Sequence, residues 1–298
     1  GSGGGGGSHN GTNTGSSGAG GSGTVILRYP TAEVSSFAVT GTLNTPSTVD
    51  TIADTAYPIA NAAYYKFDGN ANDSSGNGYN GSASNVNLNA QGKFGEASAF
   101  NGSNSTIVSS SANFTNTQDA SVSVWVKDVV APSSGYTSIY TGSGQDYFYI
   151  AVNTSGEIRT YIDNYQDSVY PRTVHQLNTI NSNITDGNWH NVVVMSKIGS
   201  AASGGGYKIY VDGVLNVSYS YSCSIRRNSG GSWSSSFGVY ATGTLAFNGK
   251  LDQTRIFTSA ISAANVTLLA NEHFQTKFTD GTDSILQFTG GSGDITFS

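Results

Sequence analysis

The sequence predicts an all-β protein with antiparallel strands, and three observations lead to that prediction. Charged residues make up only 11% of the 298 residues, against roughly 25% in ordinary globular chains, and turn-forming glycine, serine, threonine and asparagine take their place. Seventeen tyrosines stand against one methionine and one cysteine, and tyrosine suits the half-buried surface of a strand. Short alternating apolar and polar segments, separated by turn residues, recur along the chain; this pattern is typical of a β-sandwich or barrel.

Alternation with a period of two residues places the individual strands. In Ser121–Lys127 three valines take one face and Trp125 takes the other. An Asp-Gly pair between Tyr207–Val211 and Val214–Tyr219 predicts a hairpin, because both turn positions favour positive φ. Further strands are predicted at Thr24–Tyr29, Ser36–Leu43, Asp146–Val152, Glu157–Ile162, Trp189–Ser196, Phe237–Tyr240 and Lys250–Phe257.

One helix is predicted, at Ser262–Glu272. Ser262 is a suitable N-cap because its hydroxyl oxygen can accept a hydrogen bond from a free N–H of the first turn. Val266, Leu268 and Leu269 are predicted to form the apolar side of this helix.

The pattern divides the chain into four parts. Residues 1–30 are a glycine-rich segment that ends in a strand, and residues 31–61 are a linker. Residues 62–274 form the folded domain. In residues 275–298, Ser284–Phe288 and Asp294–Phe297 flank a glycine-rich turn, which predicts a hairpin or the start of a further module.

Charge and cysteine content exclude several classes of protein. The formal net charge is −6 and the pI about 5.0, so the chain has no basic surface for nucleic acid. Cys223 is the only cysteine, so an intrachain disulfide is excluded. No run of about 18 apolar residues is present, so no membrane insertion is expected.

Four segments in order resemble a known family. They are residues 63–78 (AYYKFDGNANDSSGNG), 92–102 (GKFGEASAFNG), 186–194 with 207–213, and 247–257 with 260–266. Together they are similar to laminin-G-like, concanavalin A-like domains, in the branch found in bacteria and phages. This resemblance implies a jelly-roll β-sandwich of two packed antiparallel sheets. The glycine-rich segment that ends in Thr24–Tyr29 resembles the glycine-rich domains of phage tail fibres, although a plain linker has the same composition.

A calcium site is predicted in the loop that follows the first of these motifs. Asp68, Asn70, Asp73 and Asn77 lie within ten residues, and Ca²⁺ prefers clustered oxygen ligands on a tight loop. The family resemblance implies that Asp252 contributes, although a glutamine follows it where the family usually has a second carboxylate. The alternative is that these side chains only stabilise turns through hydrogen bonds to the backbone.

A crowded group of tyrosines is the predicted ligand site. Tyrosine offers a flat apolar ring and a polar tip, which suits the C–H faces and hydroxyls of a sugar. The alternatives are that these tyrosines decorate solvent-facing strands or line a contact between subunits. The predicted ligand-binding residues are Tyr136, Tyr147, Tyr149, Tyr161, Tyr165, Asp163 and Asn164.

No enzymatic activity is predicted. Glycosidases need paired carboxylates, but the glutamates are isolated in the sequence, at Glu33, Glu96, Glu157 and Glu272. His190 lies beside Trp189, and the family resemblance implies a packing role for this pair.

The leading hypothesis is therefore a virion surface protein, such as a phage tail fibre, appendage or capsid fibre, whose laminin-G-like domain binds host-surface glycans. By analogy it would contact other virion proteins and form a homotrimer. One alternative is a purely structural or decoration protein of the virion, without a ligand. Another is an extracellular or bacterial cell-surface module that binds carbohydrate.

Overall fold

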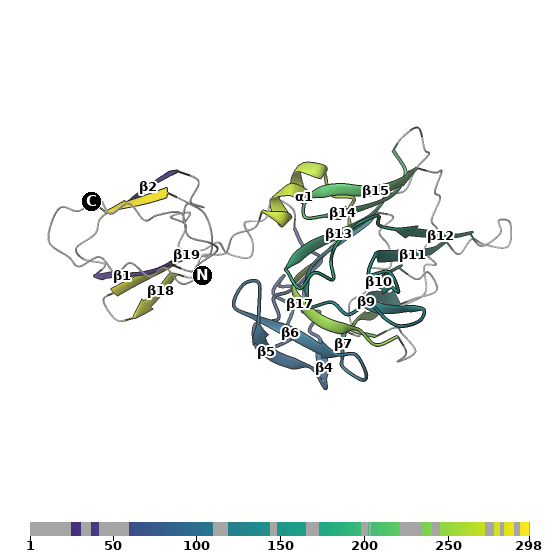
Figure 1. Cartoon of the computed structure of the whole chain (residues 1–298), viewed down its shortest axis with the longest axis horizontal. Coiled ribbons are helices and arrows are strands. Elements are labelled where there is room, and N and C mark those ends of the chain that lie inside the picture. Colours follow the sequence, from purple (N-terminus) through teal and green to yellow (C-terminus); the bar gives the residue numbers. More distant parts are fainter. Residues whose placement is uncertain are drawn as a thin grey trace. The chain divides into compact units, whose positions relative to one another are not determined.

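The structure, a computed structural model, shows a chain that divides into two compact units, Gly1–Ala56 with His273–Ser298 and Tyr57–Glu272 (Figure 1). It describes residues 25–30, 37–41, 60–109, 119–143, 148–164, 173–197, 202, 204–220, 234–239, 245–271, 277–280, 283–288 and 293–297.

The first unit is built from strands of both ends of the chain. β1 (Val25–Pro30) pairs with β19 (Asp283–Phe288), which also pairs with β18 (Lys277–Asp280). β2 (Phe37–Gly41) pairs with β20 (Gly293–Phe297). The predicted pairing of the last two strands with one another is therefore wrong. Only two residues separate β18 from β19, the commonest length of a hairpin loop, and β20 instead pairs with the N-terminal part of the chain.

The second unit, Tyr57–Glu272, is consequently inserted in the sequence between β2 and β18. Its larger sheet has eight strands in the order β15-β14-β13-β8-β17-β6-β5, with β3 paired to β17. These strands are β3 (Ala63–Tyr65), β5 (Asn87–Gln91), β6 (Glu96–Asn101), β8 (Ala120–Lys127), β13 (His190–Lys197), β14 (Gly206–Val211), β15 (Val214–Ser220) and β17 (Asn248–Phe257).

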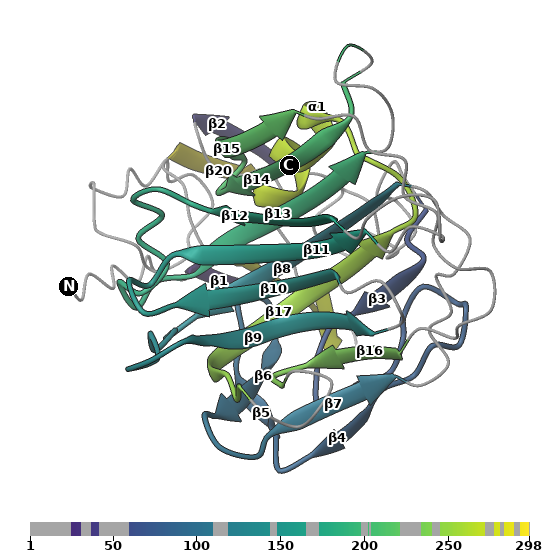
Figure 2. The same ribbon diagram turned by 90° about the vertical axis from the view of Figure 1, so that its right-hand side faces the viewer.

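The second sheet of this unit has seven strands in the order β12-β11-β10-β9-β16-β7-β4. They are β4 (Ser82–Ser84), β7 (Thr106–Ser109), β9 (Tyr136–Ser143), β10 (Phe148–Asn153), β11 (Ile158–Asn164), β12 (Thr173–Asn178) and β16 (Ser234–Phe237). All the strand pairs in both sheets are antiparallel. Figure 2 shows the sheets nearly face on, one behind the other, which is the predicted jelly-roll β-sandwich.

The main core lies between the two sheets, where alternation places apolar side chains. The three valines of β8 and, in β10, Phe148, Ile150 and Val152 belong to one buried cluster and are each at most 3% exposed. Trp125 lies on the opposite face of β8, against Phe94, with ring centroids 6.2 Å apart. The three valines predicted to share one face of β8 therefore lie together in the core, and alternate residues of β10 do the same.

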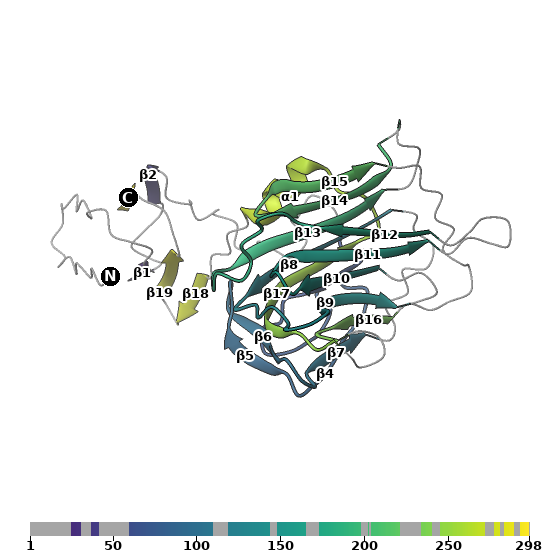
Figure 3. The ribbon, with the colours of Figure 1, turned by 45° about the vertical axis from the view of Figure 1, so that its right-hand side comes forward.

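A smaller core lies on the outer face of the eight-stranded sheet, under α1 (Ala263–Ala270). Figure 3 shows this helix beside β14 and β15. The Ser262 hydroxyl oxygen accepts a hydrogen bond of 3.2 Å from the Asn265 N–H, which confirms the predicted cap. Val266 and Leu269 are buried, but Leu268 is 51% exposed, so its predicted place on the apolar side is wrong. Each residue turns a helix by about 100°, so residue 268 points away from the side shared by 266 and 269.

The strand predicted at Phe237–Tyr240 is displaced, because β16 ends at Phe237 instead of beginning there. Gly238 follows with a φ of +83° and ends the strand, and a Cβ at this position would lie 2.1 Å from the Phe100 ring. Only glycine adopts this backbone conformation without strain and allows so close a contact. Residue 240 lies outside the described part of the chain.

Candidate functional site

The tyrosines that the structure brings together lie on the outer face of the seven-stranded sheet. Phe148, Ile150 and Val152 of β10 point into the core, so Tyr149 between them points outward. Ala151, two residues after Tyr149, points outward as well. It lies opposite Arg159 of β11, so Arg159 is on the same outer face as Tyr149.

Two tyrosines, one arginine and one glutamine form what we call the Tyr136–Arg159 platform, which comprises Tyr136, Tyr149, Arg159 and Gln176. The two tyrosine rings are stacked, with centroids 5.4 Å apart and an interplanar angle of 6°. The Arg159 Cζ lies 4.5 Å from the centroid of the Tyr136 ring. The Arg159 Nη2 group donates a hydrogen bond of 2.8 Å to the Gln176 Oε1 atom.

The platform residues differ in how much of each side chain reaches solvent. Tyr149 is only 2% exposed, so its ring supports Tyr136 and is not itself presented to a ligand. Tyr136 and Arg159 are half-buried and Gln176 is exposed. A partly accessible ring beside charged and amide groups can contact both the apolar face and the hydroxyls of a sugar.

The other predicted ligand residues are only partly described. Tyr161, Asp163 and Asn164 lie in β11, where Tyr161 is directly opposite Tyr149, but the structure describes only their backbone. Tyr147 and Tyr165 lie outside the described residues.

Sequence reasoning missed Arg159 and Gln176. The available signal was alternation within Glu157–Ile162, which places residue 159 on the face opposite Ile158. That this face also carries Tyr149 and Gln176 depends on the register between strands, which the sequence alone did not supply.

Three of the five predicted calcium ligands bind backbone groups, either of their own loop or of residues 61–64 just before it. The Asp73 carboxylate accepts hydrogen bonds of 2.9 to 3.0 Å from the backbone N–H groups of Tyr64, Ser75 and Tyr79. The Asn70 Nδ2 group donates to the Asp68 carbonyl oxygen over 2.8 Å, and the Asn77 Nδ2 group donates to the carbonyl oxygens of residues 61 and 62 over 3.3 and 3.0 Å. These contacts are the turn-stabilising role that was the alternative to metal binding.

Asp68 and Asp252 have a different environment, because both carboxylates meet the loop at residues 92–96. The Asp252 Oδ2 atom accepts hydrogen bonds from the Lys93 and Phe94 N–H groups, at 2.7 and 3.0 Å. Asp68 Oδ1 accepts one from the Glu96 N–H, at 2.9 Å. Burial, and secondarily the charge of Asp68, raises the pKa of Asp252 well above its ordinary value, against the effect of its N–H donors.

Two neighbouring carboxylates suit the oxygen chemistry of Ca²⁺, but they supply fewer than the six to eight oxygens that this ion takes. Among the described residues, no group of three or more His, Cys, Asp or Glu side chains is placed to hold a metal ion. The calcium site therefore stays a prediction, and within the five residues it rests on Asp68 and Asp252.

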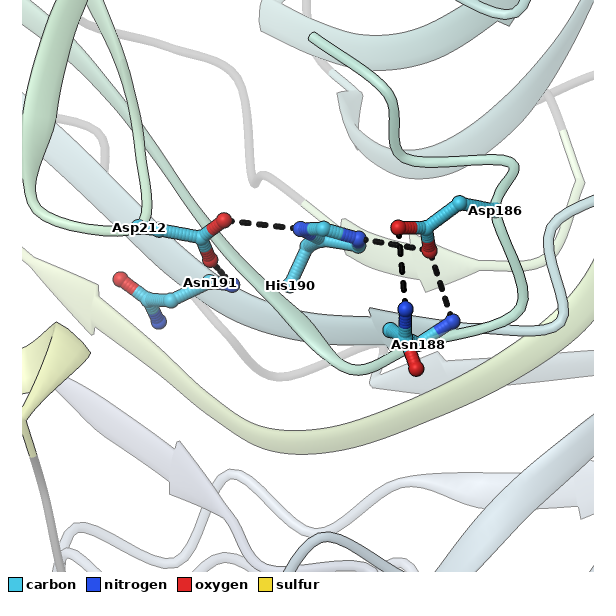
Figure 4. A network of polar contacts seen from close by, with 5 residues as sticks. All are labelled: Asp186, Asn188, His190, Asn191 and Asp212. Carbon is cyan, nitrogen blue, oxygen red and sulfur yellow. Dashed lines mark hydrogen bonds and ion pairs between the residues drawn. The ribbon is translucent and has the colours of Figure 1, made fainter. Parts of the chain in front are cut away.

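His190, the first residue of β13, is the centre of a charged network (Figure 4). Its Nδ1 atom lies 2.8 Å from Asp212 Oδ2, and its Nε2 atom lies 2.9 Å from Asp186 Oδ1. These two carboxylates raise the pKa of His190 to about 9, mainly through the Asp212 contact. The His190 hydrogen bond, with help from Asn188, lowers the pKa of Asp186 to about 2.

This network joins the Asp186 turn to the β14–β15 hairpin, because Asp212 Oδ1 also accepts a hydrogen bond of 2.8 Å from the Asn191 N–H. Both ring nitrogens of His190 and the carboxylates of Asp186 and Asp212 therefore have hydrogen-bond partners within the fold. The packing role implied for the Trp189–His190 pair stays a prediction, because these contacts of His190 are polar.

Lys93 and Trp125 form a second cation–aromatic pair, on the outer face of the eight-stranded sheet. The Lys93 Nζ atom lies 4.6 Å from the centroid of the Trp125 ring, and burial lowers the pKa of Lys93. Trp125 is 4% exposed, so its ring is closed to a ligand, unlike the half-buried ring of Tyr136.

The fold and the platform define the chain as a β-sandwich of the kind that presents ligand sites on sheet faces and loops. The family model described as the concanavalin A-like lectin/glucanases superfamily, a laminin-G-like model, matches residues 101–267, more than half of the chain. The chain therefore belongs to this family, and the resemblance found in the sequence motifs is confirmed.

Solved structures show the same fold. Domain 4 of AbnA, an extracellular arabinanase from Geobacillus stearothermophilus, matches 70% of this chain and 98% of its own, with 23% identity and a TM-score of 0.52. The binding domain of Paraclostridial Mosquitocidal Protein 1 matches 78% of this chain with 17% identity and a TM-score of 0.52. The binding domain of botulinum neurotoxin serotype D matches 71% with 18% identity and a TM-score of 0.50. The match spans 52% of the mosquitocidal protein's binding domain and 50% of the botulinum neurotoxin binding domain.

No curated protein sequence matches the chain. Among the described residues, no helix is both long enough and apolar enough to cross a membrane.

Proposed function

We propose that the chain is a lectin-like module that binds host-surface glycans and does not catalyse a reaction on them. The observation that carries this proposal is the Tyr136–Arg159 platform. It combines a supported aromatic ring with a guanidinium and an exposed amide on one sheet face. Sugars bind to such surfaces by stacking their C–H faces on the ring and by hydrogen bonding to the polar groups.

Similar structures support this proposal by what they are reported to bind. The arabinanase domain was solved in complex with arabinotriose, and the toxin domains are described as binding or receptor-binding domains. Sequence identities of 23% or less to these structures indicate a shared fold alone. The glycan and the residues that contact it therefore have to be tested on this chain.

We further propose that the module is displayed on a virion, in a tail fibre, appendage or capsid fibre, beside other virion proteins and as a homotrimer. Two features support this proposal: the glycine-rich residues 1–23, and the insertion of Tyr57–Glu272 between strands of the terminal unit. Both ends of an inserted domain continue into strands of the terminal unit. Such a domain suits display from a larger structure. We also propose a structural Ca²⁺ held by Asp68 and Asp252, which would neutralise the two neighbouring carboxylates.

A glycan array probed with the full chain tests the central proposal. Wild-type protein is expected to bind a restricted set of glycans, and Tyr136→Ala is expected to lose that binding because the accessible ring is removed. Tyr219→Ala is the matched control, since Tyr219 is 49% exposed and lies in β15 of the other sheet.

Equal loss in both tyrosine variants would contradict the assignment of the site to the platform. If folded wild-type protein binds no glycan, the lectin function is rejected, and a structural component of the virion becomes the better description.

A further inference from the structure

The Arg159 guanidinium is a half-buried cation without a carboxylate partner among the described residues. Of its five N–H donors, one donates to Gln176, and the guanidinium also contacts the Tyr136 ring. The Nε atom is buried and has no acceptor within the described part of the chain. A partly buried charge with unused donors is costly unless acceptors satisfy it, and an anion is the strongest acceptor for a guanidinium.

Among the residues whose side chains the structure describes, the neighbours of Arg159 do not supply that anion. Across the sheet it lies opposite Ala151 of β10 and Asn178 of β12, and both are uncharged. Two residues earlier in the chain, Glu157 uses its Oε2 atom to accept hydrogen bonds from the Thr179 hydroxyl and from the Ser182 hydroxyl and N–H. These donors hold the pKa of Glu157 below its ordinary value despite burial.

We propose that the glycan bound by the platform is acidic, and that the carboxylate of a sialic or uronic acid residue binds the Arg159 guanidinium. This inference rests on the proposed lectin function and names its ligand class. Guanidinium matches a carboxylate in a planar, two-bond geometry. The adjacent Tyr136 ring supports the sugar ring to which the carboxylate is attached.

The competing explanation is that Arg159 only packs over Tyr136, as long cationic side chains commonly do. That role needs no anion and predicts equal affinity for acidic and neutral glycans. It also predicts that replacing Arg159 changes stability without changing which glycans bind.

The test measures dissociation constants of the full chain for two matched pairs of ligands. The first pair is sialyllactose and lactose, and the second is an oligogalacturonate and its carboxyl-reduced form. Because a charge-assisted hydrogen bond is worth about tenfold or more in affinity, wild type is expected to prefer the acidic member of at least one pair by about tenfold. The preferred pair distinguishes a sialic from a uronic acid.

Arg159→Gln is expected to remove that preference, and Lys208→Gln is the control. Lys208 is exposed in β14 of the other sheet, so its substitution changes the net charge equally without touching the platform. Arg159→Lys keeps the positive charge but not the planar guanidinium, so it is expected to retain part of the preference for the acidic glycan. It also tests the inference if Arg159→Gln does not fold stably.

Equal binding of acidic and neutral glycans by the wild type would overturn this inference and leave the lectin function intact. A preference for the acidic glycan that survives Arg159→Gln would have the same consequence. If neither pair binds and the glycan array is also blank, the inference and the lectin function fail together.

Discussion

Replacing His190 with glutamine is expected to flatten the pH dependence of stability between pH 6.5 and about 9. In the folded protein, Asp212 and Asp186 raise the pKa of His190 from 6.5 to about 9. A raised pKa means that the protonated imidazole is stabilised by folding. This contribution is complete below pH 6.5 and is lost as the pH rises through about 9.

The size of this contribution follows from the pKa shift and from solvent screening. At about 1.4 kcal/mol for each pKa unit, the full shift would correspond to roughly 3 kcal/mol. The His190 side chain is 12% exposed, but its two carboxylate partners are 41% and 48% exposed. Because water screens such pairs, we expect about 1–2 kcal/mol.

Urea denaturation of the wild type and of His190→Gln at several values between pH 6 and 9.5 measures this contribution. The difference in the free energy of unfolding is expected to be largest at pH 6 and to decrease toward high pH. Asp128→Asn is the control, because it breaks the exposed Lys250–Asp128 ion pair of 2.8 Å and removes no histidine. Parallel pH profiles for wild type and His190→Gln, or an NMR titration that places the pKa of His190 near 6.5, would refute the reasoning.

Three further outcomes are expected. Gly238→Ala should lower the free energy of unfolding by about 3 kcal/mol or more, since its Cβ would meet the Phe100 ring in addition to the backbone strain. Gly76 has a φ of +88° but no neighbour within 4 Å, so Gly76→Ala should lower the free energy of unfolding by only about 1–2 kcal/mol. If denaturant melts showed the same loss of stability for Gly76→Ala and Gly238→Ala, the predicted clash with Phe100 would be contradicted. Ser262→Ala should cost about 1 kcal/mol through the lost cap, and an unchanged denaturation midpoint would show that this cap is dispensable. Calcium should raise the melting temperature above that in chelator, Asp252→Asn should abolish the rise, and identical melting curves would reject the calcium site.

Much of the fold could be predicted because its signals are local. Alternation located β8 and β14, an Asp-Gly pair located the turn to β15, and Ser262 marked the start of α1. Strands such as β4 (SAS) and β5 (NLNAQ) were not placed by alternation, because they consist mostly of small and polar residues. Such strands are defined by pairing with β7 and β6 and not by their own composition.

The candidate site was only partly predictable for a related reason. The sequence pointed to Tyr136 and Tyr149, since tyrosines are concentrated in that region. It did not indicate that Tyr149 would be buried as a support, or that Arg159 would meet Tyr136. Both outcomes depend on which residues of three adjacent strands lie side by side, and a register change of one residue would turn Arg159 toward the core.

The sequence by itself determined the class of fold, the family and the absence of paired carboxylates in sequence motifs, because composition, alternation and turn residues act over a few neighbouring residues. Only the tertiary structure decided which distant segments meet. It paired β1 with β19 across more than 250 residues of sequence, assembled the Tyr136–Arg159 platform from four strands, and placed His190 between two carboxylates. These contacts depend on strand register and on packing of the whole sandwich, which no local pattern encodes.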